Sequence, residues 1–238
     1  MANGIIIIDK PAGWTSMDVC AKLRGMFHEK RVGHAGTLDP MATGVLPVFI
    51  GRATRAVQYA AESDKEYIAG LKLGVVTNTQ DTTGEILEER PVDVTRDQLL
   101  AVLEAFHGWI RQVPPMYSAI KVNGKKLYEL ARKGREVERE PRTVAIRALE
   151  LLDETPPEGA DYLLRAACSK GTYVRTLCHD IGQALGCGGC MASLRRTRAA
   201  GFTLEDSVTL EAVQQAVDRG EGEGLLLPVD SYFAGLPV

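Results

Sequence analysis

The sequence contains no long apolar run, no nucleotide-binding motif and no internal repeat. None of its hydrophobic stretches approaches the roughly 20 residues that a helix needs to span a bilayer, so we expect no membrane partner. It has neither a P-loop nor a Gly-x-Gly-x-x-Gly turn after a strand, and nothing supports binding of a nucleotide cofactor. The 238 residues, 45% hydrophobic and 25% charged, instead have the composition of a globular protein with a substantial core.

Cysteine is scarce, and its pattern is weak. The five cysteines are an odd number, and the first residues lack the basic head and apolar core of a signal peptide. We therefore expect a cytoplasmic protein with reduced thiols. Cys187 and Cys190 have the spacing of a zinc-binding pair, but one such pair supplies only part of a zinc site, so no metal is expected.

Charge is unevenly distributed around a net value of −3. Lys121–Arg147 carries nine Lys or Arg against four Glu, and Leu163–Arg198 carries six against one acid. From Ala199 onward one Arg stands against seven acids. Binding to phosphate follows local basic surfaces more than total charge, so either a nucleic-acid partner or two solvated basic faces fits this distribution.

The apolar pattern predicts an α+β fold with a mixed, mainly antiparallel central sheet flanked by helices and loops. We expect strands at Ile5–Ile8, Val45–Ile50, Lys65–Leu73, Val144–Leu152 and Tyr162–Ser169, with Gly84–Glu89 as a hairpin partner of Lys65–Leu73 and an extended Ser118–Val122 before an Asn123-Gly124 turn. Helices are expected after a cap at Thr15 or Ser16, after a capping box of Thr95 and Gln98 through Phe106, over Leu127–Arg132, from Val174 and from Leu210. Gly220–Gly224 is the best candidate linker.

One loop places a single acid among glycines and prolines. Gly33–Pro47 carries Asp39 directly before Pro40, and a strand-like apolar run follows. Glycine allows close approach of a ligand to the backbone, and proline biases the preceding residue toward an extended conformation. Asp39 is either a presented nucleophile or a structural cap of a turn.

Four further polar side chains are candidates for the same site. Tyr67 lies on the apolar side of an expected strand, Tyr173 and Arg175 lie where a turn leads into a helix, and His34 precedes Asp39 in its loop. An arginine beside an aspartate would keep the carboxylate ionised, and tyrosine offers a face on which a base stacks. Taken singly, each of them also fits an ordinary core or surface position.

A series of motifs runs in order along nearly the whole chain: Asp9–Ser16, Gly33–Pro40, Gly51–Thr54, Lys65–Tyr67, Pro114–Lys121, Ser169–Arg175 and Leu194–Thr197. Together these motifs closely resemble the TruB family of pseudouridine synthases. The resemblance implies the pseudouridine synthase fold over residues 1–238, without the PUA domain that many members carry after it. It also implies a monomeric enzyme that isomerises uridine 55 in the T-loop of tRNA by base flipping, without a cofactor.

The resemblance assigns roles to individual residues. Asp39 would be the nucleophile, Arg175 its partner, and Tyr67 the ring that stacks on the flipped uracil and takes part in proton transfer. His34 would wedge into the T-loop, Tyr173 would line the pocket and Leu194 would pack over it. Lys10 would contact backbone phosphate or support the loop.

Two alternatives remain open on sequence grounds. One is an RNA chaperone that opens and refolds the tRNA elbow without chemistry. The other is a synthase that modifies another RNA within a guide-RNA particle, as archaeal and eukaryotic relatives do.

Overall fold

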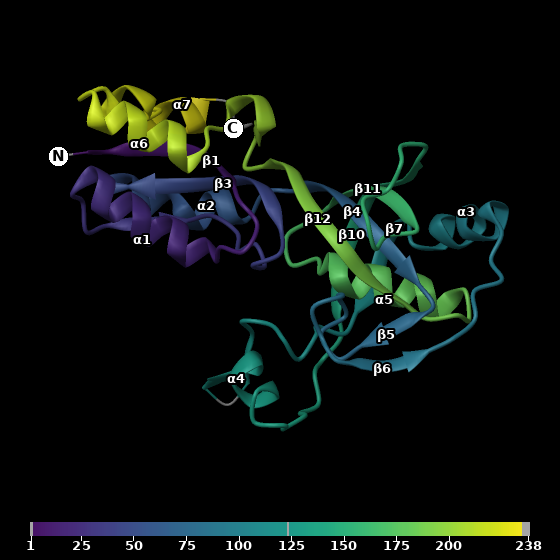
Figure 1. The fold of residues 1–238 in the computed structure, drawn as a ribbon. Helices are drawn as coiled ribbons and strands as arrows, with labels where there is room; N and C mark the ends of the chain where they lie inside the picture. Colours follow the sequence, from purple (N-terminus) through teal and green to yellow (C-terminus); the bar gives the residue numbers. More distant parts are fainter. Residues whose placement is uncertain (1, 123, 235–238) are drawn as a thin grey trace. The chain divides into compact units, whose positions relative to one another are not determined.

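A computed structural model of the chain describes residues 2–122 and 124–234 (Figure 1). It divides into two compact units: unit 1 comprises residues 1–67 and 194–238, and unit 2 comprises residues 68–193. Two long strands, β4 (Lys65–Leu73) and β12 (Gly189–Ala199), begin in one unit and end in the other. A single catalytic domain over 1–238 stays a prediction, because compact units and functional domains need not coincide.

The strands of unit 1 frame the loop that carries Asp39. β1 (Gly4–Lys10) pairs antiparallel with β3 (Thr43–Ile50), which also pairs with the short β2 (Val32–His34). β3 also runs parallel to β12, with Arg195 opposite Thr43 and Arg196 opposite Gly44. The loop of residues 35–42 therefore joins two strands of one sheet and starts and ends at fixed positions.

Helices cover this sheet. α1 (Ser16–Phe27) begins at Thr15, one of the two predicted caps, in a capping box in which Thr15 and Asp18 satisfy each other's backbone N–H groups. The remaining short elements of unit 1 are η1 (Gly51–Ala56), α2 (Val57–Ala61), β13 (Phe202–Thr203), η2 (Leu204–Asp206), α6 (Leu210–Asp218), η3 (Gly222–Leu225) and α7 (Val229–Ala234).

The core of unit 1 accounts for the run of isoleucines at the start of the chain. Ile5 and Ile7 pack with Phe49, with alanines of η1 and α2, and with Tyr232 of α7. Ile6 and Ile8 are equally buried on the other face of β1. A strand that is covered on both faces needs continuous rather than alternating apolar residues.

Unit 2 contains the larger part of the antiparallel pairing. Its strand order is β12-β4-β11-β10-β7, where β7 is Gly108–Gln112, β10 is Arg142–Leu152 and β11 is Tyr162–Cys168. β10 pairs antiparallel with both β11 and β7. Two small hairpins complete its strands: β5 (Val75–Thr77) with β6 (Ile86–Glu89), and β8 (Lys121–Val122) with β9 (Lys125–Lys126).

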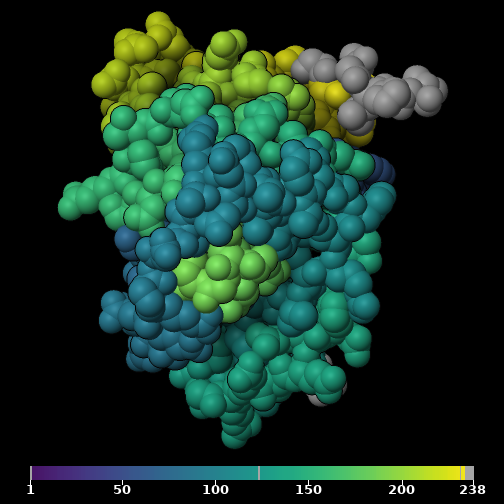
Figure 2. All heavy atoms as spheres, turned by 90° about the vertical axis from the view of Figure 1, so that its right-hand side faces the viewer, coloured from purple at the N-terminus to yellow at the C-terminus, as the bar shows by residue number. Residues whose placement is uncertain are grey.

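Among its described residues, unit 2 has three α-helices. They are α3 (Arg96–Ala105), α4 (Leu127–Ala131) and α5 (Val174–Ala184). α3 begins at the predicted capping box of Thr95 and Gln98. Figure 2 shows the light-green end of α5 exposed between teal residues from earlier in the chain, in agreement with the exposure of Gln183, Ala184 and Gly186.

The predicted fold class is confirmed, with two local corrections. β6 pairs with β5 and not with β4, because the chain turns back already after Leu73 and makes a separate small hairpin. Gly220–Gly224 is not a linker, since Glu221 N–H bonds Ala216 C=O and most of the segment forms η3 against α6. The predicted turn at Asn123 lies outside the described residues. Within the described ranges, no helix is long and apolar enough to cross a membrane.

Candidate active site

The Asp39 loop is tied to its surroundings through its main chain. Ala35 N–H donates to Pro47 C=O over 2.9 Å, and Gly13 N–H donates to Pro40 C=O over 2.8 Å. Ala42 N–H donates to the carbonyl of Asp39 itself over 3.0 Å, which closes a tight turn. The Asp39 side chain is partly exposed, whereas Leu38 beside it is buried.

Ser16 anchors the loop from α1. Its buried hydroxyl accepts a hydrogen bond from Leu38 N–H over 2.9 Å and donates to Leu38 C=O over 3.3 Å. Both polar groups of one residue are thus satisfied inside the protein, which removes the cost of burying them. Ser16, the first residue of α1, therefore fixes Leu38, the residue directly before Asp39.

Lys10 supports the loop as a buried cation. Its side chain is fully buried, and its ammonium donates to the carbonyls of Pro11, Trp14 and Pro40 over 2.8, 2.6 and 3.3 Å. Burial lowers the pKa of Lys10 to about 8, and the nearby carboxylate of Asp39 opposes that shift. This geometry favours support of the loop over contact with a phosphate, the two roles considered for Lys10.

Arg196 holds the same loop from β12. It is fully buried, its Nε donates to Val45 C=O over 2.7 Å and its Nη2 donates to Gly36 C=O over 3.0 Å. Gly44 makes this approach possible, because a Cβ at that position would lie 2.2 Å from the carbonyl oxygen of Arg196. Within residues 2–122 and 124–234, the Nη1 of Arg196 is buried without a hydrogen bond.

His34 begins the loop as a neutral imidazole. Burial lowers its pKa, and the positive charge of Arg196 acts in the same direction. Its Nδ1 is buried and has no hydrogen-bond partner in the described part of the chain. Tyr67 and Leu194, 7% and 8% exposed, belong to unit 1 as well.

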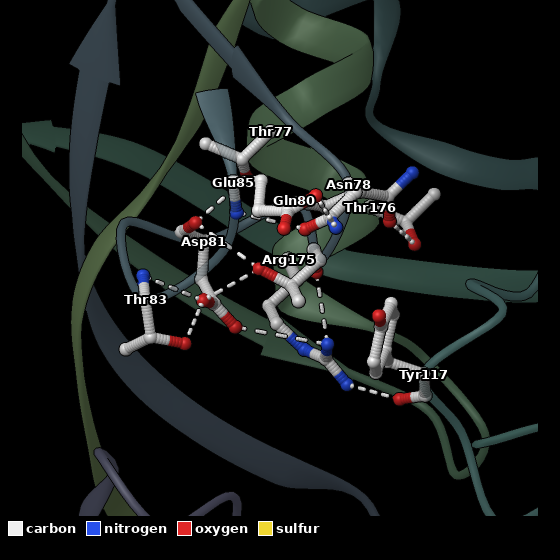
Figure 3. Close-up of polar contacts among 10 residues, drawn as sticks. Thr77, Asn78, Gln80, Asp81, Thr83, Glu85, Tyr117, Arg175 and Thr176 are labelled. Carbon is white, nitrogen blue, oxygen red and sulfur yellow. Dashed lines mark hydrogen bonds and ion pairs between the residues drawn. The ribbon is translucent and has the colours of Figure 1, made fainter. Parts of the chain in front are cut away.

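Arg175, the predicted partner of Asp39, lies at the start of α5 in unit 2 (Figure 3). Its guanidinium donates to Thr79 C=O over 2.9 Å and to Tyr117 C=O over 2.8 Å, and it lies 3.7 Å from the carboxylate of Asp81. Both charged side chains are buried. The pairing of Arg175 with Asp39 would join the two units and stays a prediction.

Asp81 organises the turn that faces Arg175. Its Oδ1 accepts hydrogen bonds from Thr79 Oγ1, Thr83 N–H and Thr83 Oγ1 over 2.9, 2.9 and 2.5 Å (Figure 3). The backbone at Gln80 takes a left-handed conformation, with φ of 64°. Three donors from its own loop hold this carboxylate in place, and the carboxylate in turn fixes the turn.

Tyr173 is positioned by a side chain from β7. Gln112, only 1% exposed, accepts from Tyr173 N–H over 3.0 Å and donates to Tyr173 C=O over 3.2 Å. The amide of Gln112 therefore acts as a two-sided clamp on the residue before α5. This fixes the backbone from which Tyr173 and Arg175 project.

The cysteine pair is not arranged as a metal centre. Cys187 and Cys190 are buried free thiols, and burial raises the pKa of Cys190 to about 11. Among the residues that the structure describes, no group of three metal-ligating side chains comes together.

Three supporting residues carry roles that sequence reasoning did not assign. Ser16 and Arg196 fall inside motifs that identify the family, but their residue types alone do not reveal that they bind the Asp39 loop. Asp81 lies in a turn rich in threonine, where the only available signal is its typical capping chemistry.

Comparison with known proteins accounts for these motifs. The model of the TruB family pseudouridylate synthase N-terminal domain matches residues 24–174, and that of the tRNA pseudouridylate synthase B C-terminal domain matches residues 175–234. The tRNA pseudouridine synthase B of Stutzerimonas stutzeri (strain A1501) is 52% identical over 99% of this chain and 77% of its own length. That of Ralstonia pickettii (strain 12J) is 48% identical over 99% and 74%.

Solved structures agree. A chain from the crystal structure of a Cbf5-Nop10-Gar1 complex is 32% identical, with a TM-score of 0.76, and the match covers 96% of this chain and 61% of that one. A chain from the structure of an H/ACA RNP bound to a substrate RNA containing 2′-deoxyuridine is 30% identical, with a TM-score of 0.72 and coverage of 96% and 60%. This chain thus spans about three fifths of those proteins. With both family models matched along its length, the chain belongs to the TruB family of pseudouridylate synthases.

Proposed function

We propose that this enzyme converts uridine to pseudouridine in the T-loop of tRNA, at position 55, with Asp39 as the nucleophile. The observation that carries the proposal is the fixed loop of unit 1. Two buried cations, Lys10 and Arg196, and the hydroxyl of Ser16 all bind main-chain groups of that loop. These contacts fix the backbone on either side of Asp39, whose carboxylate is partly exposed, and the chain belongs to a family of pseudouridylate synthases.

The reaction needs the base outside its stack. The N1–C1′ bond breaks, the uracil turns, C5 bonds to C1′, the C5 proton leaves and N1 gains one, so no redox cofactor is required. Flipping a nucleotide costs a few kcal/mol of lost stacking, and an aromatic ring recovers roughly 1–3 kcal/mol of it. In the proposal Tyr67 supplies that ring, and His34 fills the vacancy left in the T-loop.

Asp39 would act as an ionised carboxylate. The ordinary pKa of aspartate, about 3.9, already leaves it charged at neutral pH, and the ammonium of Lys10 nearby favours the charged form. Arg175 would pair with it when substrate is bound, while Tyr173 and Leu194 line and cover the uracil. Attack on the ring and attack on the sugar are both compatible with this arrangement.

A basic hairpin supplies the expected contact with RNA. Lys121 of β8 lies directly opposite Lys126 of β9, an arrangement of like charges that is unfavourable unless an anion or solvent screens it. The ring of Tyr128 lies 5.4 Å from the Lys126 ammonium and 5.2 Å from the Arg132 guanidinium. In the proposal this hairpin binds phosphates of the T-arm, and the protein acts as a monomer in the cytoplasm.

Release of tritium from C5-labelled tRNA tests the assignment of Asp39. Asp39→Asn should lower turnover at least about a thousandfold, because it removes the nucleophile and leaves the shape. Binding of tRNA should stay within about threefold of the parent. Asp153→Asn is the matched control, since Asp153 is an exposed aspartate outside the Asp39 loop. Turnover near that of the parent in Asp39→Asn would refute the nucleophile.

Two further measurements address the alternatives. An RNA chaperone without chemistry would release no tritium even with the parent protein. Mapping the modified position on an unmodified tRNA transcript, with this protein alone, separates position 55 from other targets and from a guide-dependent enzyme. Tyr67→Phe keeps the stacking face and loses the hydroxyl, so parental activity of that variant would exclude proton transfer by Tyr67.

A further inference from the structure

Unit 2 contains a pocket that none of the roles above uses. It has a volume of about 380 Å³ and lies between the first half of α5, β7 and the segment before β10. We call it the α5 pocket; its polar lining comes from Gln80, Arg111, Arg139, Thr176, His179 and Asp180. All of these residues belong to unit 2, and the pocket is large enough for a small-molecule ligand.

The pocket contains cationic donors with unused capacity. Arg111 is exposed, and its guanidinium makes no hydrogen bond or ion pair with any described residue. Arg139 donates through Nη2 to Glu136 over 2.9 Å, but its Nε is buried and has no partner within the described ranges. Two guanidiniums at one pocket are typical of phosphate recognition.

The same pocket contains one desolvated acceptor. Asp180 lies one turn after Thr176 on α5, and no described side chain or backbone group bonds its carboxylate. Burial raises the pKa of Asp180 to about 6, so it is ionised at neutral pH in spite of its surroundings. An ionised carboxylate accepts hydrogen bonds and cannot donate any, which selects a ligand with N–H or O–H groups.

A ligand that satisfies both features must carry an anion and a donor edge. Phosphate alone would meet the arginines but would be repelled by Asp180. Among the bases, guanine presents two adjacent donors, N1–H and the 2-amino group, to a carboxylate, while uracil presents one between two carbonyl oxygens. The amide of Gln80, held by Thr176 over 2.7 Å, and the apolar edge of Val113 and Pro114 complete a site that a base can occupy.

We propose that the α5 pocket binds a guanine ribonucleotide, with its phosphate at Arg111 and Arg139 and its base edge at Asp180. If this nucleotide is a guanosine of the substrate tRNA, the inference rests on the proposed function. Binding of a free guanine nucleotide does not depend on the proposed function. The pocket also adjoins the buried ion pair of unit 2, because Thr176 and Gln80 are the chain neighbours of Arg175 and Asp81 (Figure 3).

Calorimetric titration of the whole protein with GMP, AMP, UMP and inorganic phosphate tests the pocket. We expect GMP to bind at least tenfold more tightly than the other three. Arg111→Gln should weaken GMP binding about tenfold, and Asp180→Asn should remove the preference for GMP over AMP. Arg96→Gln and Asp153→Asn, at an exposed ion pair of the same unit, are the matched controls and should change neither.

The other possible outcomes either overturn the proposal or show whether the bound guanine nucleotide is free or part of the RNA. Absence of GMP binding up to millimolar concentration, equal binding of phosphate and GMP, or indifference of GMP binding to Arg111→Gln would each overturn it. If GMP binds as expected, the KM for tRNA decides the source. A rise in KM without a change of kcat in Arg111→Gln supports a guanosine of the RNA, and an unchanged KM supports a free nucleotide. Inactivity of the parent protein on tRNA would refute the proposed function and leave the GMP result intact.

Discussion

The loops that carry Asp81 and Asp39 are stabilised in opposite ways, one through the carboxylate itself and the other through the main chain. In unit 2 the carboxylate of Asp81 is itself buried, accepts three hydrogen bonds from its own turn and faces Arg175. In unit 1 the loop around Asp39 is held through the carbonyls of Gly36 and Pro40, while the carboxylate is partly exposed.

The difference separates a structural acid from a candidate catalytic one. A carboxylate that fixes a turn through three donors is not available as a nucleophile, because any reaction would have to break those bonds first. A loop whose backbone is fixed by cations from other elements can present its acid in a defined position. Variants that act on one loop and not on the other can break or sharpen this comparison.

Asp81→Ala should have the largest effect. It removes three hydrogen bonds and the buried carboxylate that faces Arg175, so we expect a loss of about 3–5 kcal/mol of stability. Chemical denaturation measures it. Asp81→Asn keeps an acceptor for the turn and should lose clearly less; equal losses would show that the hydrogen bonds do not hold the turn.

Arg196→Met should come second. The methionine fills much of the same volume but leaves the carbonyls of Val45 and Gly36 without their buried donors, at about 2–4 kcal/mol in total. Turnover should fall further than stability explains, because the Asp39 loop is released. Arg195→Met is the control, since Arg195 pairs with Asp9 in a half-exposed position. A stable, fully active Arg196→Met protein would show that the loop does not depend on β12.

Asp180→Asn should change stability in a pH-dependent way. The folded pKa of Asp180 lies near 6, above the ordinary value of 3.8, so the folded state binds more protons than the unfolded state between those values. Relative to its ionised form, protonated Asp180 stabilises the folded state; this contribution is complete below about pH 4 and is lost as the pH rises through 6. The asparagine variant should therefore be about 1–3 kcal/mol more stable than the parent at pH 7.5 and equal to it near pH 4.

Denaturation curves at several pH values check this prediction, with Asp153→Asn, at an exposed aspartate of the same unit, as the control. Arg111, Arg139 and His179 face the same pocket, so the difference should shrink at low ionic strength if the guanidiniums already compensate Asp180. A difference that is independent of pH would contradict a raised pKa.

Lys121→Glu together with Lys125→Glu should have the smallest effect on the fold. Both side chains are exposed, so stability should change by less than about 0.5 kcal/mol. Affinity for tRNA should fall, and the slope of log K against log salt should decrease by roughly one for each phosphate that the variant no longer binds. Lys22→Glu, at an exposed position of α1, is the control. Unchanged binding and slope would place the RNA elsewhere.

Much of this architecture follows from local sequence signals. Thr15 and Thr95 mark helix starts because a cap satisfies backbone donors that have no partner within the helix. The alternating apolar residues of Lys65–Leu73 predict β4 with its observed bounds, since they face a core. The β5–β6 hairpin is not evident from the sequence, because pairing of short, exposed strands depends on turns rather than on an apolar pattern.

The supporting contacts of the site could not be predicted in the same way. Asp39 stands out because it is a lone acid among glycines, but the donors that hold its loop come from Lys10, Ser16 and Arg196, whose roles depend on tertiary structure. A buried arginine and a surface arginine look alike in sequence. The full burial of Arg196 is settled only when β12 lies beside β3.

The two bonds of Arg196 span 151 and 160 positions of the chain. Contacts between such distant residues form late in folding, because the long intervening segment must first be ordered or closed into a loop. During synthesis the ribosome delivers the acidic loop long before it delivers the strand that fixes it. A nascent chain would then hold the Asp39 carboxylate without the strand that fixes its loop, and chemical competence would appear only after β12 has emerged.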